Sequence, residues 1–197
     1  MELIAVTDDS HPVNELAEII VAIKDEIDFI QIREKTKSAR DIMRLLDELQ
    51  AGGVNNRKII INDRLDIALL KGIPNLHLPE HGFPVKMVKH QYPDLRVGCS
   101  VHSYEKAKAA EKDGADYVLY GHCFDTDSKK RITPNGVEPI LQMKQRLSIP
   151  IYAIGGVTAE KVPVIKQAEA NGIAVMSGIF QADEPYFAAK KFQEAIS

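Results

Sequence analysis

The feature that most limits how this chain can fold is a regular alternation of short apolar runs with amphipathic stretches. Eight runs rich in β-branched residues have the length of buried strands, at residues 3–6, 29–33, 58–62, 76–78, 96–100, 117–120, 151–154 and 173–176. A stretch with apolar residues at helical spacing follows each run. Strict alternation predicts a parallel sheet, because parallel strands need long crossover connections, which are usually helices.

Eight such units predict that the sheet closes into a (β/α)₈ TIM barrel, one domain spanning residues 1–197. The alternative is an open doubly wound sheet, which often carries a G-x-G-x-x-G fingerprint after its first strand; that motif is missing here. Helix starts are predicted at Pro12, at Ser38 with Asp41 three residues later, at Ser103 and at Thr158.

Composition excludes several classes of function. The 197 residues carry a formal net charge of −3 and no block of Lys or Arg, so we expect neither a nucleic-acid partner nor a membrane partner. We expect no signal peptide and no spanning helix, hence a cytoplasmic protein. Cys99 and Cys123 lack metal-ligand spacing and are expected to be free thiols. Homo-oligomer formation stays open.

In a barrel of this kind the site lies where the strands run into the loops that follow them. Gln31, Arg33 and Lys35 alternate onto one face at the end of the second run, where the two cations suit a phosphate or carboxylate; otherwise they are solvated loop charges. Asn62 and Asp63 end the third run and suit a ligand amide or a metal, or a turn and helix cap.

Three more runs carry polar side chains near their ends. The fourth run carries His77, the fifth carries Ser100 with His102 just beyond it, and a histidine in a strand is more often structural than catalytic. His122 follows Gly121 at the end of the sixth run, where imidazole is a ready acid–base group near neutral pH.

Loops and glycine turns complete the candidate site. The loop after His122 offers Thr126, Ser128 and Lys129 to a ligand, or is a solvated surface loop. Gly155-Gly156 and Ser177-Gly178 end the last two runs, and glycines there allow backbone N–H groups to approach a phosphate; tight turns alone would also need them.

Seven strings taken together resemble the thiamine phosphate synthase superfamily. They are QIREK at 31–35, IINDR at 60–64, NLHL at 75–78, VGCSVH at 97–102, GADY at 114–117, TDSK at 126–129 and AIGGV at 153–157. The resemblance implies a (β/α)₈ barrel. It also implies that Gln31, Arg33, Lys35 and Asn62 hold a pyrimidine diphosphate, and that Thr126, Ser128, Gly156, Ser177 and Gly178 hold a thiazole phosphate.

Two departures from the synthase pattern shape the expected activity. The synthases share a magnesium ion between the aspartate matching Asp63 and a second aspartate, whose place is taken here by Gly82. The synthases read Gly-Pro-x-Phe where this chain has Gly121-His122-Cys123-Phe124. This combination resembles the thiazole tautomerase (TenI) branch of the superfamily.

That branch implies an isomerase of thiamine biosynthesis without cofactor or metal. His122 would move one proton and convert the exocyclic-alkene carboxythiazole phosphate into the aromatic 2-(2-carboxy-4-methylthiazol-5-yl)ethyl phosphate. Two alternatives stay open. One is a working thiamine phosphate synthase, a transferase, and the other is a non-catalytic paralogue that senses a ligand.

Overall fold

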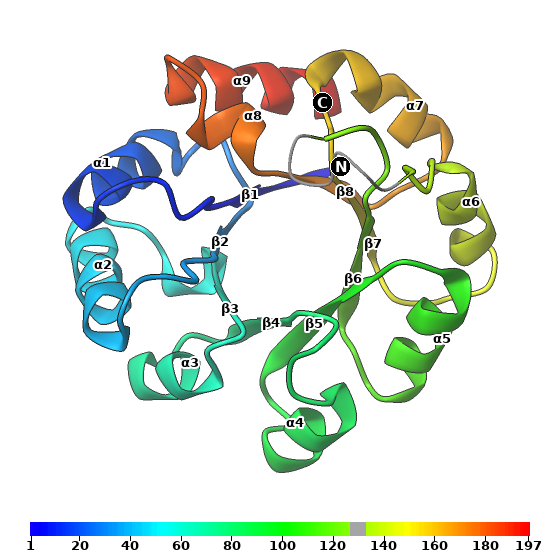
Figure 1. The fold of residues 1–197 in the computed structure, drawn as a ribbon, viewed down its shortest axis with the longest axis horizontal. Coiled ribbons are helices and arrows are strands. Elements are labelled where there is room, and N and C mark those ends of the chain that lie inside the picture. The colour runs from blue at the N-terminus through cyan, green and yellow to red at the C-terminus, as the bar shows by residue number, and fades with distance from the viewer. Residues whose placement is uncertain (127–132) are drawn as a thin grey trace.

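The chain folds into a closed barrel of eight parallel strands surrounded by helices (Figure 1). The computed structural model describes residues 1–126 and 133–197. The strands pair in chain order, and β1 closes the ring by pairing with β8. They are β1 (Glu2–Val6), β2 (Phe29–Ile32), β3 (Ile59–Asn62), β4 (Asn75–Leu78), β5 (Arg96–Val101), β6 (Tyr117–Gly121), β7 (Ile151–Ile154) and β8 (Gly172–Val175). The predicted (β/α)₈ barrel is confirmed.

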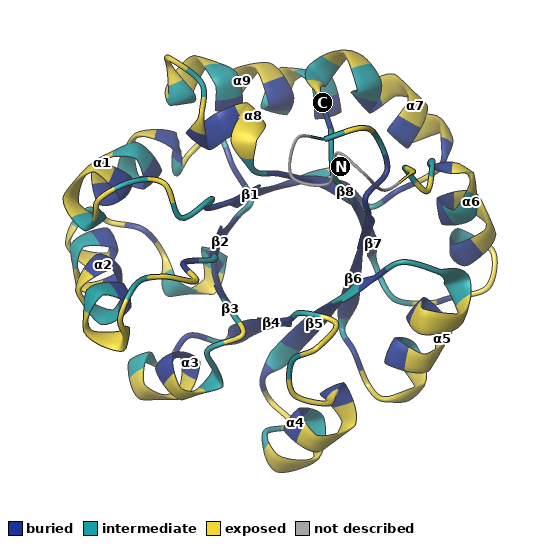
Figure 2. Cartoon of the chain, viewed as in Figure 1, coloured by how far each residue is buried: buried dark blue, intermediate teal, exposed yellow. Residues whose placement is uncertain are grey.

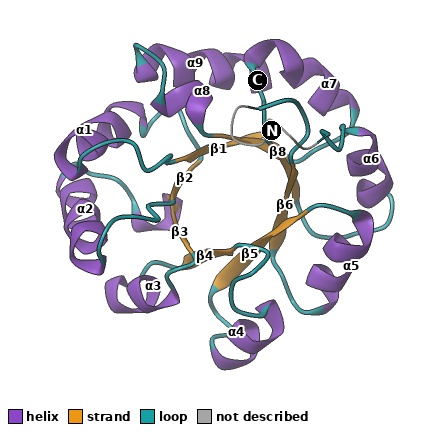
Figure 3. Ribbon diagram, in the orientation of Figure 1, coloured by secondary structure: helices purple, strands orange, loops and turns teal. Residues whose placement is uncertain are grey.

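Helices form the outer ring of the molecule, and strands and helices are separated clearly in Figure 3. The α-helices are α1 (Val13–Ile23), α2 (Ala39–Ala51), α3 (Leu65–Lys71), α4 (Val85–Gln91), α5 (Tyr104–Lys112), α6 (Glu138–Lys144), α7 (Val162–Gln167), α8 (Ser177–Phe180) and α9 (Pro185–Ile196). In the part of the chain that the structure describes, the short 3₁₀ helices η1 (Asn56–Lys58) and η3 (Ala159–Lys161) precede β3 and α7.

Two apolar layers stabilise this arrangement. The larger layer lies between the strands and the inward faces of the helices, which are buried on that side and exposed on the other (Figure 2). A second cluster includes Ile4, Ile60, Tyr117, Leu119 and Tyr152, which are all buried. The alternation of side chains along each strand sends one set to each layer.

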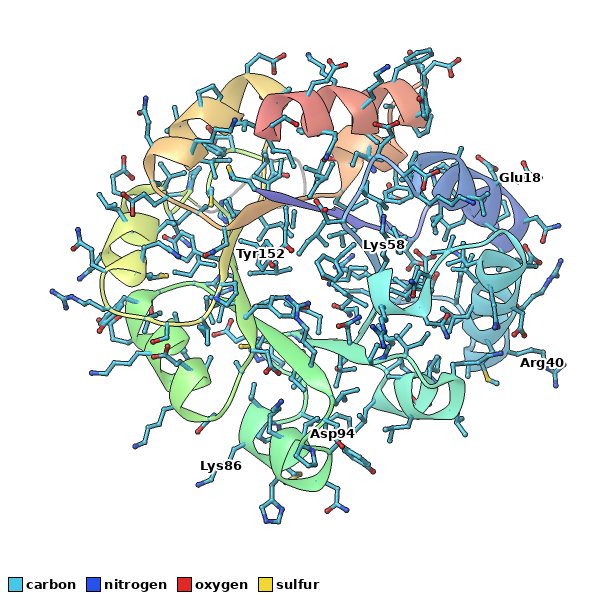
Figure 4. All side chains as sticks on the ribbon, turned by 180° about the vertical axis from the view of Figure 1, so that it is seen from behind. Glu18, Arg40, Lys58, Lys86, Asp94 and Tyr152 are labelled. Atoms are coloured by element: carbon cyan, nitrogen blue, oxygen red, sulfur yellow. The ribbon has the colours of Figure 1, made fainter. Side chains whose placement is uncertain are left out.

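The amino-terminal end of the barrel is filled by side chains from the first residues of several strands. The Arg96 guanidinium lies 4.9 Å from the ring centroid of Phe29 and 4.4 Å from that of Tyr117. Tyr152, labelled inside the ring of strands in Figure 4, donates a hydrogen bond to the Glu2 carboxylate. This packing leaves the carboxyl-terminal ends of the strands as the place for a ligand.

Local signals predicted several helix starts. Ser38 and Asp41 form a reciprocal capping box at α2, and the Ser103 side chain accepts a hydrogen bond from the Lys106 backbone N–H at α5. Thr158 differs from the prediction, because it precedes the 3₁₀ helix η3 and its side chain makes no cap hydrogen bond there. The four-residue α8 is an addition to the predicted pattern of eight helices.

The capping box gives a first stability prediction. Replacing Ser38 by alanine removes an acceptor from the first turn of α2 and should lower the free energy of unfolding by about 1 kcal/mol. Urea unfolding followed by circular dichroism measures this change. Ser148→Ala, at an exposed loop serine, is the control. Equal stability of the two variants would show that the box contributes nothing.

In the part of the chain that the structure describes, no helix is both long enough and apolar enough to cross a membrane.

Candidate active site at the carboxyl-terminal end of the barrel

A cavity of about 1030 Å³ opens where the strands run into their following loops. It brings together nearly every residue that the sequence singles out, although these residues are spread over most of the chain. The predicted site residues that line it are Gln31, Arg33, Lys35, Asn62, His122, Thr126, Gly156, Ser177 and Gly178. Ser128, also predicted, lies outside the described residues, as does Lys129.

The second strand places its polar residues at the cavity in a fixed arrangement. The buried Gln31 side chain donates from Nε2 to the Asn62 Oδ1 at 3.1 Å. Arg33 is held at its backbone N–H by the Thr7 hydroxyl at 2.8 Å, and its guanidinium reaches to 3.9 Å from the sulfur of Met176, next to Ser177. Arg33 therefore spans the mouth from β2 to the end of β8.

An ion pair between the buried Glu34 and the half-buried Lys37, which the sequence did not single out, supports this side of the cavity. The Glu34 side chain is fully buried, and its Oε2 lies 2.5 Å from the Lys37 Nζ, which is also 3.5 Å from Asp9. Within the described residues, Arg33 and Lys35 form no ion pair with a carboxylate. These two cations are thus available to an anionic ligand, while Lys37 is already neutralised.

The floor of the cavity carries uncharged polar groups. The His77 Nε2 lies 2.9 Å from the Ser100 hydroxyl, and burial lowers the pKa of His77 to about 3, so its ring is neutral at physiological pH. Among the described residues, the His77 Nδ1 and the Gln31 Oε1 have no hydrogen-bond partner. Buried polar atoms without partners are costly, so this floor is suited to a ligand ring that carries its own donors and acceptors.

Two glycines at the end of β7 shape the space around His122. A Cβ on Gly155 would lie 2.3 Å from the His122 Cβ, and a Cβ on Gly156 would lie 2.2 Å from the Asp125 carbonyl oxygen. Both glycines have positive φ, at 96° and 64°. Gly155 therefore gives His122 its room, whereas a Cβ on Gly121 would meet the Ile154 carbonyl oxygen instead.

The short helix α8 presents its first two residues to the cavity. Ser177 and Gly178 are exposed there, while Ile179 and Phe180 are buried (Figure 2). A Cβ on Gly178 would lie 3.0 Å from the Val175 Cγ1 and 3.3 Å from the Phe192 Cζ. Packing of α8 against α9 thus favours glycine at 178 in addition to any approach of a phosphate.

Asp63 stands at the end of β3 with a positive φ of 65°. A Cβ on Gly82 would lie 3.0 Å from the Asp63 Oδ1, so a side chain at position 82 would face this carboxylate. Nearby carboxylates are engaged elsewhere: Asp66 pairs with Arg64 at 2.6 Å, and Glu80 lies 3.6 Å from His102 and 3.7 Å from Lys106.

These residues do not fit a resident magnesium ion. The described part of the chain contains no group of three or more His, Cys, Asp or Glu side chains arranged to hold a metal. Magnesium prefers several oxygen ligands in octahedral geometry, so Asp63 alone is a poor site for a resident ion; an ion that arrives with a diphosphate substrate would take most of its oxygen ligands from that substrate and from water. We therefore assign no chemical step to a bound metal.

Restoring a carboxylate beside Asp63 should create metal binding. Gly82→Asp would place two like charges together and crowd Pro79, so the free protein should lose stability. Added Mn²⁺ or Mg²⁺ should relieve the repulsion and raise the melting temperature, with Mn²⁺ affinity about tenfold above that of the unaltered chain. Gly82→Asn is the matched control, with the same shape and no charge. An equal response of both variants to the ion would contradict the proximity of position 82 to Asp63.

Comparisons with known proteins identify what this chain resembles. A family described as "Thiamine monophosphate synthase" matches residues 3–179. The thiamine-phosphate synthase of Caldivirga maquilingensis is 37% identical over 196 residues, covering 96% of this chain and 94% of that protein. The thiamine-phosphate synthase of Chlorobium phaeovibrioides is 39% identical over 164 residues, with 82% and 78% covered.

A comparison with solved structures finds the same kind of relative. The thiamine phosphate pyrophosphorylase of Pyrococcus furiosus superposes with a TM-score of 0.83 at 27% identity, covering 99% of this chain and 95% of that one. A 3-hexulose-6-phosphate synthase superposes with a TM-score of 0.78 at 18% identity, which shows a shared fold alone.

The names of these relatives correct the prediction of enzyme class. His122 and Gly82 in the sequence predict an isomerase, the thiazole tautomerase. The relatives at 37–39% identity are named as synthases, which are transferases, and so favour the alternative reading. The tautomerase assignment is therefore wrong by these comparisons. His122 lies buried at the cavity, and its predicted catalytic role stays untested.

Proposed function

We propose that this chain, which belongs to the thiamine monophosphate synthase family, is a thiamine-phosphate synthase that joins a pyrimidinylmethyl diphosphate to a thiazole phosphate. The observation that carries the proposal is the match in sequence over nearly the whole chain to proteins named for that activity. The cavity supports it, because the cations that follow β2 and the glycines that follow β7 and β8 border the same space.

The reaction forms one bond and breaks one. The thiazole ring nitrogen donates its electron pair to the methylene carbon of the pyrimidine, and the carbon–oxygen bond to the diphosphate breaks. Pyrophosphate leaves with that electron pair, and the thiazole becomes a thiazolium. No electron is lost to an oxidant, and no proton need leave the ring.

The residues of this chain bind, orient and offset charge in this scheme. Arg33 and Lys35 face the diphosphate and stabilise the negative charge that grows on the leaving group. Gln31, Asn62 and the neutral His77 ring hold the pyrimidine by hydrogen bonds.

The second substrate takes the other rim. Thr126, Gly156, Ser177 and Gly178 receive the phosphate of the thiazole. Holding both substrates in one cavity converts a bimolecular reaction into a unimolecular one, which supplies much of the rate enhancement without a covalent intermediate.

Release of pyrophosphate tests the proposal. The purified chain is incubated with the pyrimidinylmethyl diphosphate, the thiazole phosphate and magnesium, and each component is then omitted in turn. We expect rapid pyrophosphate release when both substrates are present and little when the thiazole phosphate is missing. Release at the same rate without thiazole phosphate would indicate a hydrolase and would contradict the proposal.

A further inference from the structure

His11 lies outside the cavity, in the loop between β1 and α1, yet it contacts the helix that borders the cavity. Its Nε2 lies 2.7 Å from the Phe180 carbonyl oxygen at the end of α8. Its Nδ1 lies 2.9 Å from the Glu15 Oε1 on α1. The ring centroids of His11 and Phe180 are 6.5 Å apart, so the two residues make an aromatic contact in addition to the polar one.

The two contacts are made together only when both ring nitrogens carry protons. A carbonyl oxygen accepts and never donates, so the Nε2 must carry hydrogen. The Glu15 carboxylate is likewise an acceptor, so the Nδ1 bond is strongest when that nitrogen is also protonated. The imidazolium form of His11 satisfies both partners, and the neutral form satisfies one.

A second contact ties the same loop to α8. The Gln181 Nε2 donates to the Asp8 Oδ2 at 2.8 Å, while the Asp8 Oδ1 accepts from the Ser10 hydroxyl at 2.6 Å. The β1–α1 loop thus holds the carboxyl-terminal end of α8 at two points. Since α8 has four residues, fixing that end also fixes Ser177 and Gly178 at the cavity.

We propose that His11 is a positioning residue for anion binding: through its bond to the Phe180 carbonyl it sets the orientation in which α8 presents Ser177 and Gly178 to a phosphate. The proposal rests on the proposed function, in which Ser177 and Gly178 receive the phosphate of the thiazole. His11 touches no substrate and acts through α8.

The charge environment of His11 makes this positioning depend on pH. Burial alone would lower the pKa of His11, but the bonds to Phe180 and Glu15 and the charges of Glu15 and Asp8 raise it above its ordinary value of 6.5. Burial would raise the pKa of Asp8, but hydrogen bonds from Ser10 and Gln181 and the charge of His11 lower it, so Asp8 stays ionised.

The raised pKa of His11 determines whether the contact with α8 strengthens or weakens as the pH rises. Both His11 bonds are made below the unfolded-state pKa; as the pH rises through the higher folded-state value, the ring keeps one proton for two acceptors, so its bond to the Phe180 carbonyl is weakened. The charged side chains that act on His11 are Glu15 from α1 and Asp8 from its own loop, and α8 contributes the Phe180 carbonyl. Loosening at high pH therefore originates in His11.

Nuclear magnetic resonance on the whole chain tests the proposal without either substrate. The probe is inorganic sulfate, which stays a dianion over the range used, from about pH 6 to about pH 9. The backbone amide signals of Ser177 and Gly178 report binding at α8, separately from binding at Arg33 or Lys35. Ring signals of His11 report its protonation.

We expect the amide signals of α8 to titrate together with the His11 ring, and the sulfate dissociation constant there to rise roughly tenfold across the range. His11→Phe should bind sulfate weakly at both ends of the range. His11→Gln, which keeps a donor for Phe180 and cannot titrate, should bind at an intermediate level independent of pH. His90→Phe, at an exposed histidine on α4, should behave like the unaltered chain.

Three results would overturn the proposal: no shift of Ser177 and Gly178 with sulfate, pH-independent binding in the unaltered chain, or unchanged binding in both His11 variants. None of these results depends on synthase activity. If the chain binds sulfate as expected but does not release pyrophosphate, the role of His11 stands and the proposed function is contradicted.

Discussion

Replacing Arg33 and Lys35 together by alanine should lower kcat/KM for coupling by roughly 10²–10⁴-fold, because two charge-assisted hydrogen bonds to the diphosphate are lost. The loss should be larger in kcat/KM for the pyrimidinylmethyl diphosphate than in kcat/KM for the thiazole phosphate, since the glycines after β7 and the start of α8 remain intact. Steady-state kinetics with each substrate varied in turn measures the loss of kcat/KM for each of the two substrates.

The matched control is the double variant Arg40→Ala, Lys86→Ala. Both side chains are exposed on outer helices, α2 and α4, away from the cavity (Figure 4). It removes the same two charges from the protein as a whole and should leave kcat/KM within about twofold. An equal loss of kcat/KM in both double variants would mean that the net charge of the protein, and not the position of Arg33 and Lys35, governs the reaction.

Gly156→Ala should reduce stability more than any ordinary glycine substitution, by roughly 3–5 kcal/mol, because positive φ and severe crowding act together. The added Cβ would be forced against the Asp125 and Phe124 carbonyl oxygens. The loop after β6 must then move, and ligand binding at the cavity should fall with it.

Gly72→Ala separates the two causes. Gly72 has a φ of 61°, close to the 64° of Gly156, but a Cβ there would meet nothing within 4 Å. This control should lose about 1 kcal/mol, the cost of the left-handed conformation alone. Denaturant unfolding compares the two variants. Equal losses would show that crowding at Gly156 has been overestimated.

The fold was predictable because it rests on a pattern repeated eight times. Each run supplies a strand and each amphipathic stretch a helix, so an error of one or two residues at an end, as at Lys58 or Val101, leaves the topology unchanged. The residues at the strand ends followed from the same rule. Gln31, Asn62, His77 and Ser177 line one cavity because parallel strands in a closed barrel all end on the same side.

What the sequence did not predict depends on contacts between distant segments. The bond from His11 to Phe180 joins residues 169 positions apart, and neither residue belongs to a motif. The pair between the buried Glu34 and Lys37 joins a residue inside the string at 31–35 to one beyond it, and no motif links the two. The room beside His122 comes from Gly155 on the next strand, and not from the adjacent Gly121.

The enzyme class was mispredicted for a related reason. His122 and Gly82 are two local departures from the synthase pattern, whereas the resemblance to synthases extends over the whole chain. Position 82 does face Asp63, so the departure is real, but it describes how a metal would be held and does not itself define the reaction.

Formation of thiamine phosphate tests the central claim most directly. The unaltered chain is mixed with both substrates and magnesium, and the product is identified by mass spectrometry and by oxidation to the fluorescent thiochrome. The account predicts thiamine phosphate and pyrophosphate in equal amounts, with the Arg33→Ala, Lys35→Ala variant strongly impaired. Absence of thiamine phosphate from a folded chain that binds both substrates would contradict the assignment as a synthase.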